Sequence, residues 1–245
     1  TKEEIDLIKR YHKRNPTLEL PELWHRLRKQ GYTRCLESLY RVMKKLEMLP
    51  KKPKKATYKP KPYEQMTYPG ERVQVDVKVV PRKCIADPEM KLYQYTAIDE
   101  YTRIRFLYGY EEQSTYSSAD FVNRLVKWYK RRGITVKCIQ TDNGFEFTNR
   151  FSPSKRDKKT LFENTLSQLD IEHKLIRPYT PRHNGKVERS HREDHNKFYS
   201  CHRFYSCDDL NVQLAARLSR TNNRPMRPLK WFSPIEFLNN SVQYD

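Results

Sequence analysis

The spacing of apolar residues over 1–49 predicts three short helices, because leucines and aromatic residues recur there every three or four positions. The first helix covers about 3–14 and ends before Pro16, the second begins near Pro21, and the third follows Thr33, which is expected to cap it. The positions expected to be buried in the second and third helices are Leu23, Trp24, Leu27, Leu36, Leu39, Tyr40, Met43 and Leu46. This segment is therefore predicted to be a small all-helical module.

A row of polar and basic residues on the outer side of the third helix indicates a binding role for this module. Its members lie three or four positions apart and share one side of the helix: Arg34, Ser38, Arg41 and Lys45. Two helices joined by a short turn, the second of them basic outside, are typical of a helix-turn-helix whose last helix enters the major groove of DNA. A three-helix bundle with a solvated basic face fits the same pattern.

Residues 50–68 are predicted to be a linker, because prolines and lysines are mixed there without apolar periodicity. Proline keeps such a segment extended, and the lysines repel one another. If the linker lies along a DNA phosphate backbone, the contacts come from Lys51, Lys52, Lys54 and Lys55. A purely mechanical tether fits the composition equally well.

From residue 70 the pattern changes to clustered strands and then to alternating strands and helices. Residues 73–80 alternate valine with polar side chains, the period of a strand with one buried face, and further strands at 93–99 and 103–110 predict an antiparallel meander. Helices are expected at 117–132, 160–169, from about 184 and at 208–220, with short strands ending at Asp142 and covering 171–175. The order predicts an α/β core over 69–200, a mixed sheet flanked by helices, and a helical, then irregular segment over 201–245.

The chain is strongly basic, since 49 Lys and Arg residues against 30 Asp and Glu residues give a net charge of +19. A polyanion such as nucleic acid is the expected partner, and a basic soluble protein without a binding role is the alternative. No apolar run approaches the roughly 20 residues that span a bilayer, the first residues lack a secretory signal, and the five cysteines are scattered. These features predict a cytoplasmic protein without a membrane partner. The chain does not begin with methionine, which suggests an absent upstream segment.

Three acidic residues occupy positions that suit phosphodiester chemistry. Asp76 lies in mid-strand, Asp142 at a strand end that turns through Asn-Gly, and Glu188 on a helix after a loop containing Pro and Gly. Magnesium takes oxygen ligands, chiefly carboxylates, and two such ions can activate an attacking oxygen and stabilise a leaving oxygen. The three carboxylates would form such a site if their strands are neighbours, although each alone also fits a structural role. Asp99 and Glu146 are weaker candidates.

The motifs around these carboxylates carry a specific resemblance. VQVDV, QTDNGFEF and RPYTPRHNGKVERSHR occur in this order, and together they resemble the catalytic core of bacterial insertion-sequence transposases and retroviral integrases, the DDE recombinase superfamily. IDEYTRIRF and NNRPMRPLKWFSPIEFL extend the resemblance to about residues 69–240, and the helical N-terminus is similar to the DNA-binding region of such transposases. The pattern P-x-x-NG-x-x-ER is its most specific part.

This resemblance implies a ribonuclease-H-like fold, dependence on Mg²⁺ or Mn²⁺ with two ions bound, and metal-ligand roles for Asp76, Asp142 and Glu188. It implies a bacterial, nucleoid-associated DNA transposase that binds the terminal inverted repeats of its element, cleaves a strand and joins the freed 3′-hydroxyl to target DNA. Pairing of two DNA ends implies a homodimer or larger assembly. Two alternatives stay open, namely a non-catalytic DNA-binding regulator derived from a transposase and a nuclease similar to ribonuclease H.

The last motif also predicts DNA contacts, because the helix that begins there has a basic side. Arg192 and His195 lie four and seven positions after Glu188 and share its face, where they could reach phosphates beside the metal ions. The loop before the helix lies near its positive end, which suits a phosphate, although capping suits Asn184 equally. The predicted contacts are His183, Asn184, Lys186, Arg189, Arg192 and His195, with Lys186 and Arg189 expected as surface charges off that face.

Two further features of the sequence need a structure to interpret. Between Asp142 and Glu188 lie 45 residues, more than is typical of this family, and the surplus is expected to be a basic inserted loop at 149–160, either solvated or in contact with DNA. Candidate zinc ligands follow Glu188, but the spacing of the two cysteines lacks the usual C-x-x-C pattern. These candidates are His191, His195, Cys201, His202 and Cys207.

Overall fold

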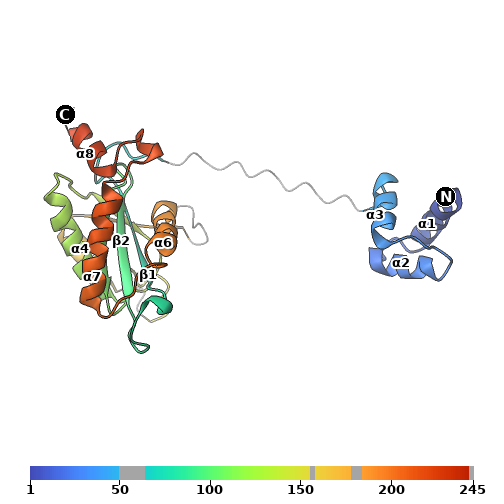
Figure 1. Ribbon diagram of the computed structural model, residues 1–245, viewed down its shortest axis with the longest axis horizontal. Helices are drawn as coiled ribbons and strands as arrows, with labels where there is room; N and C mark the ends of the chain where they lie inside the picture. The colour runs from blue at the N-terminus through green and yellow to red at the C-terminus, as the bar shows by residue number, and fades with distance from the viewer. Residues whose placement is uncertain (50–63, 155–157, 178–183, 243–245) are drawn as a thin grey trace. The chain divides into compact units, whose positions relative to one another are not determined.

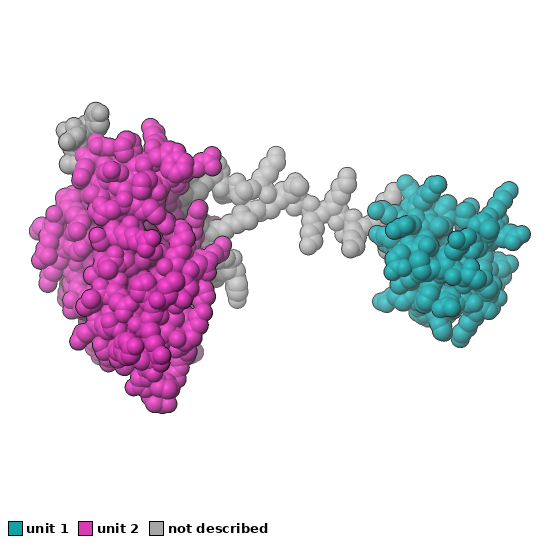
Figure 2. All heavy atoms as spheres, in the orientation of Figure 1, with its two compact units in different colours: residues 1–62 teal, residues 63–245 magenta. Residues whose placement is uncertain are grey.

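The computed structural model describes residues 1–49, 64–154, 158–177 and 184–242. It divides the chain into two compact units, residues 1–62 and residues 63–245, drawn in teal and magenta in Figure 2. Within the described residues, no helix is both long enough and apolar enough to cross a membrane. Five predicted DNA contacts lie outside the described residues: Lys51, Lys52, Lys54, Lys55 and His183.

The smaller unit contains the three expected helices, α1 (Lys2–Arg14), α2 (Leu20–Arg28) and α3 (Leu36–Lys45), which are drawn in blue in Figure 1. Apolar side chains from all three helices and from the turn after α2 meet in one core. The core residues are Ile8, Leu23, Leu27, Tyr32, Leu39 and Met43. The helical periodicity of the sequence therefore produces a closed hydrophobic cluster.

The start and the outer side of α3 differ from the sequence expectation. Its N-cap residue is Cys35 rather than Thr33. The backbone before the helix is held instead by the indole of Trp24, which donates to the carbonyl oxygen of Arg34 at 2.9 Å. Because α3 begins at Leu36, Arg34 lies before the helix and not on its outer side. Tyr40, which was expected in the core, is 44% exposed, because it lies about 100° around the helix from the buried row.

The larger unit is built on a five-stranded sheet in the order β3-β2-β1-β4-β5. Its strands are β1 (Val73–Val79), β2 (Tyr93–Asp99), β3 (Arg105–Tyr110), β4 (Cys138–Thr141) and β5 (Glu172–Leu175). The first three strands pair antiparallel, which confirms the predicted meander, while β4 runs parallel to β1 and β5 parallel to β4. The sheet is mixed, as the order of elements predicted.

Helices cover both faces of this sheet (Figure 1). One face packs against α4 (Thr115–Lys130) and α5 (Leu161–Gln168), and the other packs against α6 (Gly185–Lys197) and α7 (Cys207–Asn222). The α4 face is apolar, with fully buried side chains from strands and helix: Val73, Val75, Tyr95, Ala97, Phe121 and Leu125. The described part of this unit also contains three short elements, η1 (Arg82–Cys84), η3 (Arg227–Leu229) and α8 (Pro234–Val242).

Helix α7 packs against the edge strand β3 and completes its hydrogen bonding. The Asn222 side chain accepts from the backbone N–H of Arg105 and donates to its carbonyl oxygen, both at 2.9 Å. Asn211 makes the same pair of contacts with Gly109, at 2.7 and 3.1 Å. A Cβ atom at Gly109 would lie 2.6 Å from the Leu210 side chain, so this close approach needs glycine. The C-terminal segment is thus packed on the core, where it covers an edge that could otherwise pair with another chain.

Candidate active site

The parallel pairing of β1 with β4 brings two predicted catalytic residues to matching positions. Gln74 of β1 is the register partner of Gln140 of β4. Asp76 and Asp142 each follow two positions later, and side chains two residues apart along a strand point to the same face. Asp76 and Asp142 therefore come together on the face of the sheet that α6 covers.

The loop after β4 orients the Asp142 side chain. Its Oδ1 atom accepts from the backbone N–H of Gly144 at 3.0 Å, which closes a turn of the Asx type. The side-chain amide of Asn143 donates to the carbonyl oxygen of Ile176 at 3.1 Å and so ties this loop to the end of β5. Asn143 and Gly144 thus form the turn that was expected to aim Asp142.

Glu188 reaches the same region from the first turn of α6. The start of α6 is fixed to β1 by Gln74, whose side-chain oxygen accepts from the backbone N–H groups of Lys186 and Val187 at 3.1 and 3.2 Å. These contacts satisfy donors that a helix start leaves unpaired. Gln74 is 1% exposed, so β1 is covered on both faces here, which corrects the single buried face expected from its alternation.

The acidic residues lie close enough to repel one another. Burial, followed by the charge of Asp142 and then by the charges of Glu188 and Glu146, raises the pKa of Asp76 from 3.8 to about 7, while a backbone hydrogen bond opposes this shift. The charges that act on Asp76 come from two other segments of the chain, namely the loop after β4 and the start of α6. We call Asp76, Asp142, Glu188 and Glu146 the acidic cluster.

The two weaker carboxylate candidates have different surroundings. Glu146 belongs to the acidic cluster, and its carboxylate accepts from the side-chain amide of Gln113 at 2.6 Å. Asp99 is fully buried and accepts from the backbone N–H of Gly70 at 2.9 Å and from the N–H and hydroxyl of Thr102 at 2.7 and 2.6 Å. Asp99 therefore holds the turn after β2 together.

The raised pKa of Asp76 predicts a pH-dependent stability for the metal-free protein. The folded chain holds a proton at Asp76 up to a pKa of about 7, whereas the unfolded chain releases it near 3.8, so this stabilising contribution is lost as the pH rises through about 7. One pKa unit corresponds to about 1.4 kcal/mol, and Asp76→Asn is expected to raise the free energy of unfolding in EDTA at about pH 8 by at least about 2 kcal/mol. Urea unfolding of wild type and variant at about pH 5 and about pH 8 measures this difference.

The exposed Asp87 provides the matched control for this measurement, because Asp87→Asn removes the same charge outside the acidic cluster. Its stability is expected to follow that of the wild type at both pH values. Equal stability of Asp76→Asn and wild type at about pH 8 would contradict the repulsion within the cluster.

Oxygen donors of this kind suit a hard divalent cation, and a bound cation would relieve the repulsion at Asp76. Among the described residues, however, no group of three or more His, Cys, Asp or Glu side chains is gathered tightly enough to hold a metal ion. The carboxylates therefore form an acidic cluster rather than a closed ligand set. The five candidate zinc ligands, all of them described, likewise do not assemble into a metal site: His191, His195, Cys201, His202 and Cys207.

A buried imidazole lies against Asp76. The Nδ1 atom of His191 is 3.4 Å from Oδ2 of Asp76, and its Nε2 atom is 3.0 Å from the Thr96 hydroxyl. Burial, followed by the charge of Arg105, lowers the pKa of His191 to about 3, so the ring is neutral. His191 was named from the sequence as a candidate zinc ligand. It lies four residues after the buried Val187 and so shares the buried side of α6, and this helical spacing is the signal that could have placed it.

A second buried polar group joins α6 to α7 and the sheet. Asp194 of α6 is fully buried and pairs with Arg105 of β3 and with Arg217 of α7, whose Nε atom lies 3.0 Å from Oδ1. The Gln94 side chain also donates to Asp194, at 3.0 Å. Burial alone would raise the pKa of Asp194, but the Arg105 guanidinium and these hydrogen bonds lower it below its ordinary value. Asp194 is therefore ionised and fully paired, and none of these four residues was singled out from the sequence.

The predicted DNA contacts on α6 fall into two groups. Three are exposed on the same helix as the exposed Glu188: Arg189, Arg192 and His195. Lys186, expected as a surface charge, instead pairs with the buried carboxylate of Glu100, because a buried charge requires a partner. Asn184 is 2% exposed and does not cap α6 with its side chain, since Gln74 satisfies the first N–H groups instead. DNA contacts by Lys186 and Asn184 stay predictions.

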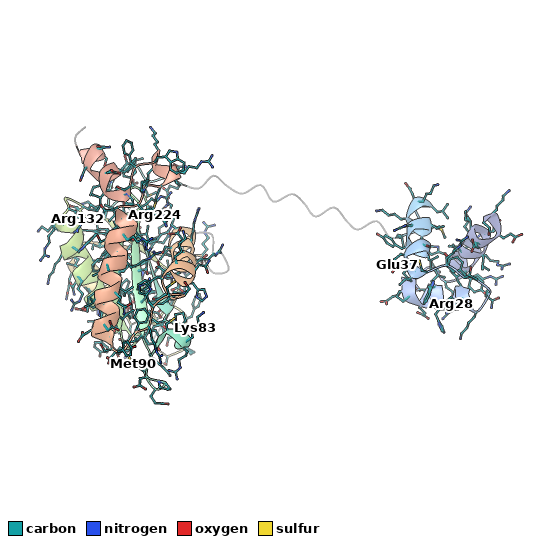
Figure 3. The ribbon with its side chains drawn as sticks, viewed as in Figure 1. Arg28, Glu37, Lys83, Met90, Arg132 and Arg224 are labelled. Atoms are coloured by element: carbon teal, nitrogen blue, oxygen red, sulfur yellow. The ribbon has the colours of Figure 1, made fainter. Side chains whose placement is uncertain are left out.

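The C-terminal segment is held beside α6 by an ion pair. Arg224, labelled in Figure 3, donates to both carboxylate oxygens of Glu193 at 3.0 and 2.8 Å. Next to this pair lies a pocket of about 500 Å³ whose lining includes Arg103, Arg189 and Arg227. The motif NNRPMRP thus contributes to a basic hollow on the side of α6 that carries Arg189.

The expected basic insertion is described in part, at residues 149–154 and 158–160. The side-chain amide of Asn149 donates to the carbonyl oxygen of Lys158 at 2.8 Å and joins these two pieces. Thr160 caps α5, as its hydroxyl accepts from the backbone N–H of Glu163 at 3.1 Å. The insertion therefore leads directly into α5, and its contact with DNA stays a prediction.

Two family models, both described as the integrase core domain, match this chain over residues 67–181 and 169–234. The chain belongs to the DDE transposase and integrase superfamily. The first model spans Asp76 and Asp142 of the integrase core, and the second spans Glu188. The residues that the two family models match therefore include the acidic cluster.

Two curated relatives are similar to this integrase core in sequence. A protein named as an integrase, ORF3 of Spiroplasma virus SpV1-C74, is 32% identical over 173 residues, which are 69% of this chain and 47% of that protein. A protein named as the transposase of insertion sequence element IS5376 from Geobacillus stearothermophilus is 27% identical over 215 residues, or 88% of this chain and 51% of that protein. The chain thus spans about half the length of these relatives.

One solved complex of an integrase is similar in fold. A chain of the simian T-cell lymphotropic virus intasome, in complex with the PP2A regulatory subunit B56 gamma, matches with a TM-score of 0.57 at 14% identity. The match covers 87% of this chain and 69% of that chain. At this identity the likeness concerns the fold alone, and it agrees with the predicted ribonuclease-H-like sheet flanked by helices.

Proposed function

We propose that this chain is the DNA-binding and catalytic part of a transposase that cleaves DNA at the ends of its element and transfers the strands to target DNA. The observation that carries the proposal is the convergence of Asp76, Asp142 and Glu188 in one acidic cluster of an integrase core. Two of these carboxylates come from paired strands and the third from a helix fixed to one of them, and rigid elements of this kind suit a catalytic site. The names of the two relatives support the same activity.

Asp76, Asp142 and Glu188 would hold the divalent ions, two Mg²⁺ or Mn²⁺, which when bound supply an activated oxygen nucleophile and stabilise the leaving oxygen. The role of the protein itself is to bring these carboxylates together. The strand register aligns Asp76 with Asp142, and Gln74 fixes the helix that carries Glu188. Because the His191 ring is neutral, it does not neutralise the carboxylate of Asp76, which can therefore bind a cation.

The DNA contacts proposed for the larger unit lie beside the acidic cluster. Arg192 and His195 are exposed on the helix that carries Glu188, where they would bind phosphates of the reacting DNA. The net charge of +19 supports a polyanionic partner. Because two element ends have to be paired, we propose a homodimer or larger assembly on DNA, in the bacterial cytoplasm and associated with the nucleoid.

The test of this function is to incubate the full chain with end-labelled DNA that carries the terminal repeats flanking its gene, in Mg²⁺ or Mn²⁺, and to size the products. New 3′ ends at the repeat and longer strand-transfer products are expected, and both are expected to vanish in EDTA. Binding without cleavage would identify a non-catalytic regulator instead. Cleavage without preference for the repeats and without strand transfer would identify a nuclease.

For the smaller unit, Arg41→Ala is expected to weaken binding to the terminal repeats by about tenfold, because Arg41 is exposed on α3 and the last helix of a helix-turn-helix enters the major groove. Gel-shift titrations on repeat DNA and unrelated DNA at one salt concentration measure the effect. Arg10→Ala, an exposed arginine of α1, is the matched control for the loss of one charge. If both variants keep the wild-type affinity and sequence preference, the unit is a solvated helical bundle.

A further inference from the structure

The buried side chains next to Asp76 form a hydrogen-bond chain whose direction follows from the types of its groups. Asp194 is the starting point, because an ionised carboxylate accepts hydrogen bonds only. The Gln94 side chain lies 3.0 Å from Asp194, so the group that faces the carboxylate is its amide NH₂. The Gln94 oxygen accordingly faces Tyr199, whose hydroxyl donates to it. The orientation of Gln94 is therefore determined from both ends.

The direction continues through Thr96 to the imidazole. The amide nitrogen of Gln94 also lies 2.9 Å from the Thr96 hydroxyl and donates its second hydrogen there. A hydroxyl can accept twice, but Thr96 is fully buried, so its own hydrogen needs an accepting partner. That partner is Nε2 of His191, at 3.0 Å, so Nε2 accepts and carries no hydrogen. In a neutral imidazole the hydrogen is then on Nδ1, the atom 3.4 Å from Oδ2 of Asp76.

We propose that His191 is a positioning residue for Asp76, held as the Nδ1–H tautomer by the chain that runs from Asp194 through Gln94 and Thr96. The inference rests on the proposed role of Asp76 as a metal ligand. The Nδ1–H group places a donor 3.4 Å from Oδ2, while the backbone N–H of Val77 donates to Oδ1 at 2.9 Å. Both oxygens thus have a donor nearby on the protein side, and polar partners of this kind orient the ligands of metal ions.

The position of His191 allows one ring to contact two strands of the sheet from the helix α6. Asp76 and Thr96 are register partners on β1 and β2, so their side chains lie next to each other on one face. His191 contacts both of them and lies three residues after Glu188 on α6. The ring therefore links the strand that carries one carboxylate to the helix that carries another.

The tautomer can be measured without any metal ion. Long-range ¹H–¹⁵N spectra of the ¹⁵N-labelled full chain in EDTA at about pH 8, above the pKa of Asp76, distinguish a protonated Nδ1 from a protonated Nε2, and His191→Asn identifies the signals of this ring. The wild type is expected to show the Nδ1–H form, and Thr96→Val, which keeps the branched shape of threonine, is expected to show a mixture. An Nε2–H form in the wild type, or an unchanged Nδ1–H form in Thr96→Val, overturns the proposal.

Binding of Mn²⁺ alone, measured by calorimetry, is the second readout. The amide of Asn reaches the place of Nδ1, whereas the amide of Gln reaches the place of Nε2. His191→Gln is therefore expected to weaken Mn²⁺ binding by at least about tenfold, while His191→Asn keeps most of the affinity. Both variants place a carboxamide in the same buried position, so a folding defect that they share cannot produce a difference in Mn²⁺ affinity between them.

His202→Ala, an exposed histidine after the end of α6, is the control and is expected to bind Mn²⁺ as the wild type does. Equal Mn²⁺ affinity of the wild type and His191→Gln overturns the positioning role. A wild type that binds no Mn²⁺ overturns the metal role of the acidic cluster instead, and the tautomer of His191 in the metal-free chain then decides the present proposal by itself.

Discussion

Asp142→Asn is expected to keep DNA binding and to lower metal-dependent strand cleavage and strand transfer by about 10⁴-fold or more, the usual loss when one member of a catalytic set is removed. Asparagine has nearly the same size and keeps an oxygen that can accept from the backbone N–H of Gly144, so the loop after β4 should keep its shape. It lacks the anionic oxygen that a hard divalent cation requires. The assay on end-labelled terminal repeats, run beside a gel shift, separates the two effects.

Asp170→Asn is the matched control for this variant. Asp170 is exposed and has a positive φ of 55°, a conformation that asparagine also tolerates. Its cleavage and strand transfer should equal those of the wild type. Undiminished cleavage by Asp142→Asn would falsify the assignment of Asp142 as a metal ligand.

Asp194→Ala is expected to lower the free energy of unfolding by about 3–5 kcal/mol, since removing one partner leaves buried charge uncompensated. The side chains of Arg105 and Arg217 are only 4% and 5% exposed, and both pair with Asp194. Without this carboxylate, two guanidinium groups would stay buried between α6, α7 and the sheet. Urea unfolding of the full chain followed by circular dichroism measures the change in the transition of the larger unit.

Asp208→Ala is the control, because Asp208 is an exposed acidic residue in the first turn of α7. Its removal should cost less than about 1 kcal/mol, the range of an exposed helix-end charge. A similarly small loss in Asp194→Ala would show that the two arginines find other partners, and the hydrogen-bond chain to His191 would then lose its fixed starting point.

Local periodicity was sufficient to predict most of the secondary structure. The alternating valines of β1 and the helical spacing of α3 each state which side is apolar, and both elements form close to their predicted bounds. Element ends were less accurate, as Cys35 at the start of α3 shows, because the backbone there is held by the distant Trp24 and not by a local cap. A short-range pattern does not contain such a contact.

The surroundings of the predicted site residues needed the tertiary structure. The spacing of Glu188, Arg192 and His195 on one helix is a local property, and all three are exposed on α6. Whether a charge is used internally is a non-local property, since Lys186 pairs with Glu100, which lies 86 positions earlier in the chain. The sequence therefore identified basic residues that could contact DNA, but it did not show which of them are already paired with acidic residues inside the fold.

By itself, the sequence determined the order of the elements, the strongly basic character of the chain and the motifs that mark it as an integrase core. The tertiary structure decided what those motifs can do together. Parallel pairing of β1 with β4 set Asp76 beside Asp142, and packing of α6 on β1 and β2 added Glu188 and turned His191 against Asp76. The physical reason is that repulsion between carboxylates and the direction of hydrogen bonds depend on distances in space, which strand register and helix packing establish.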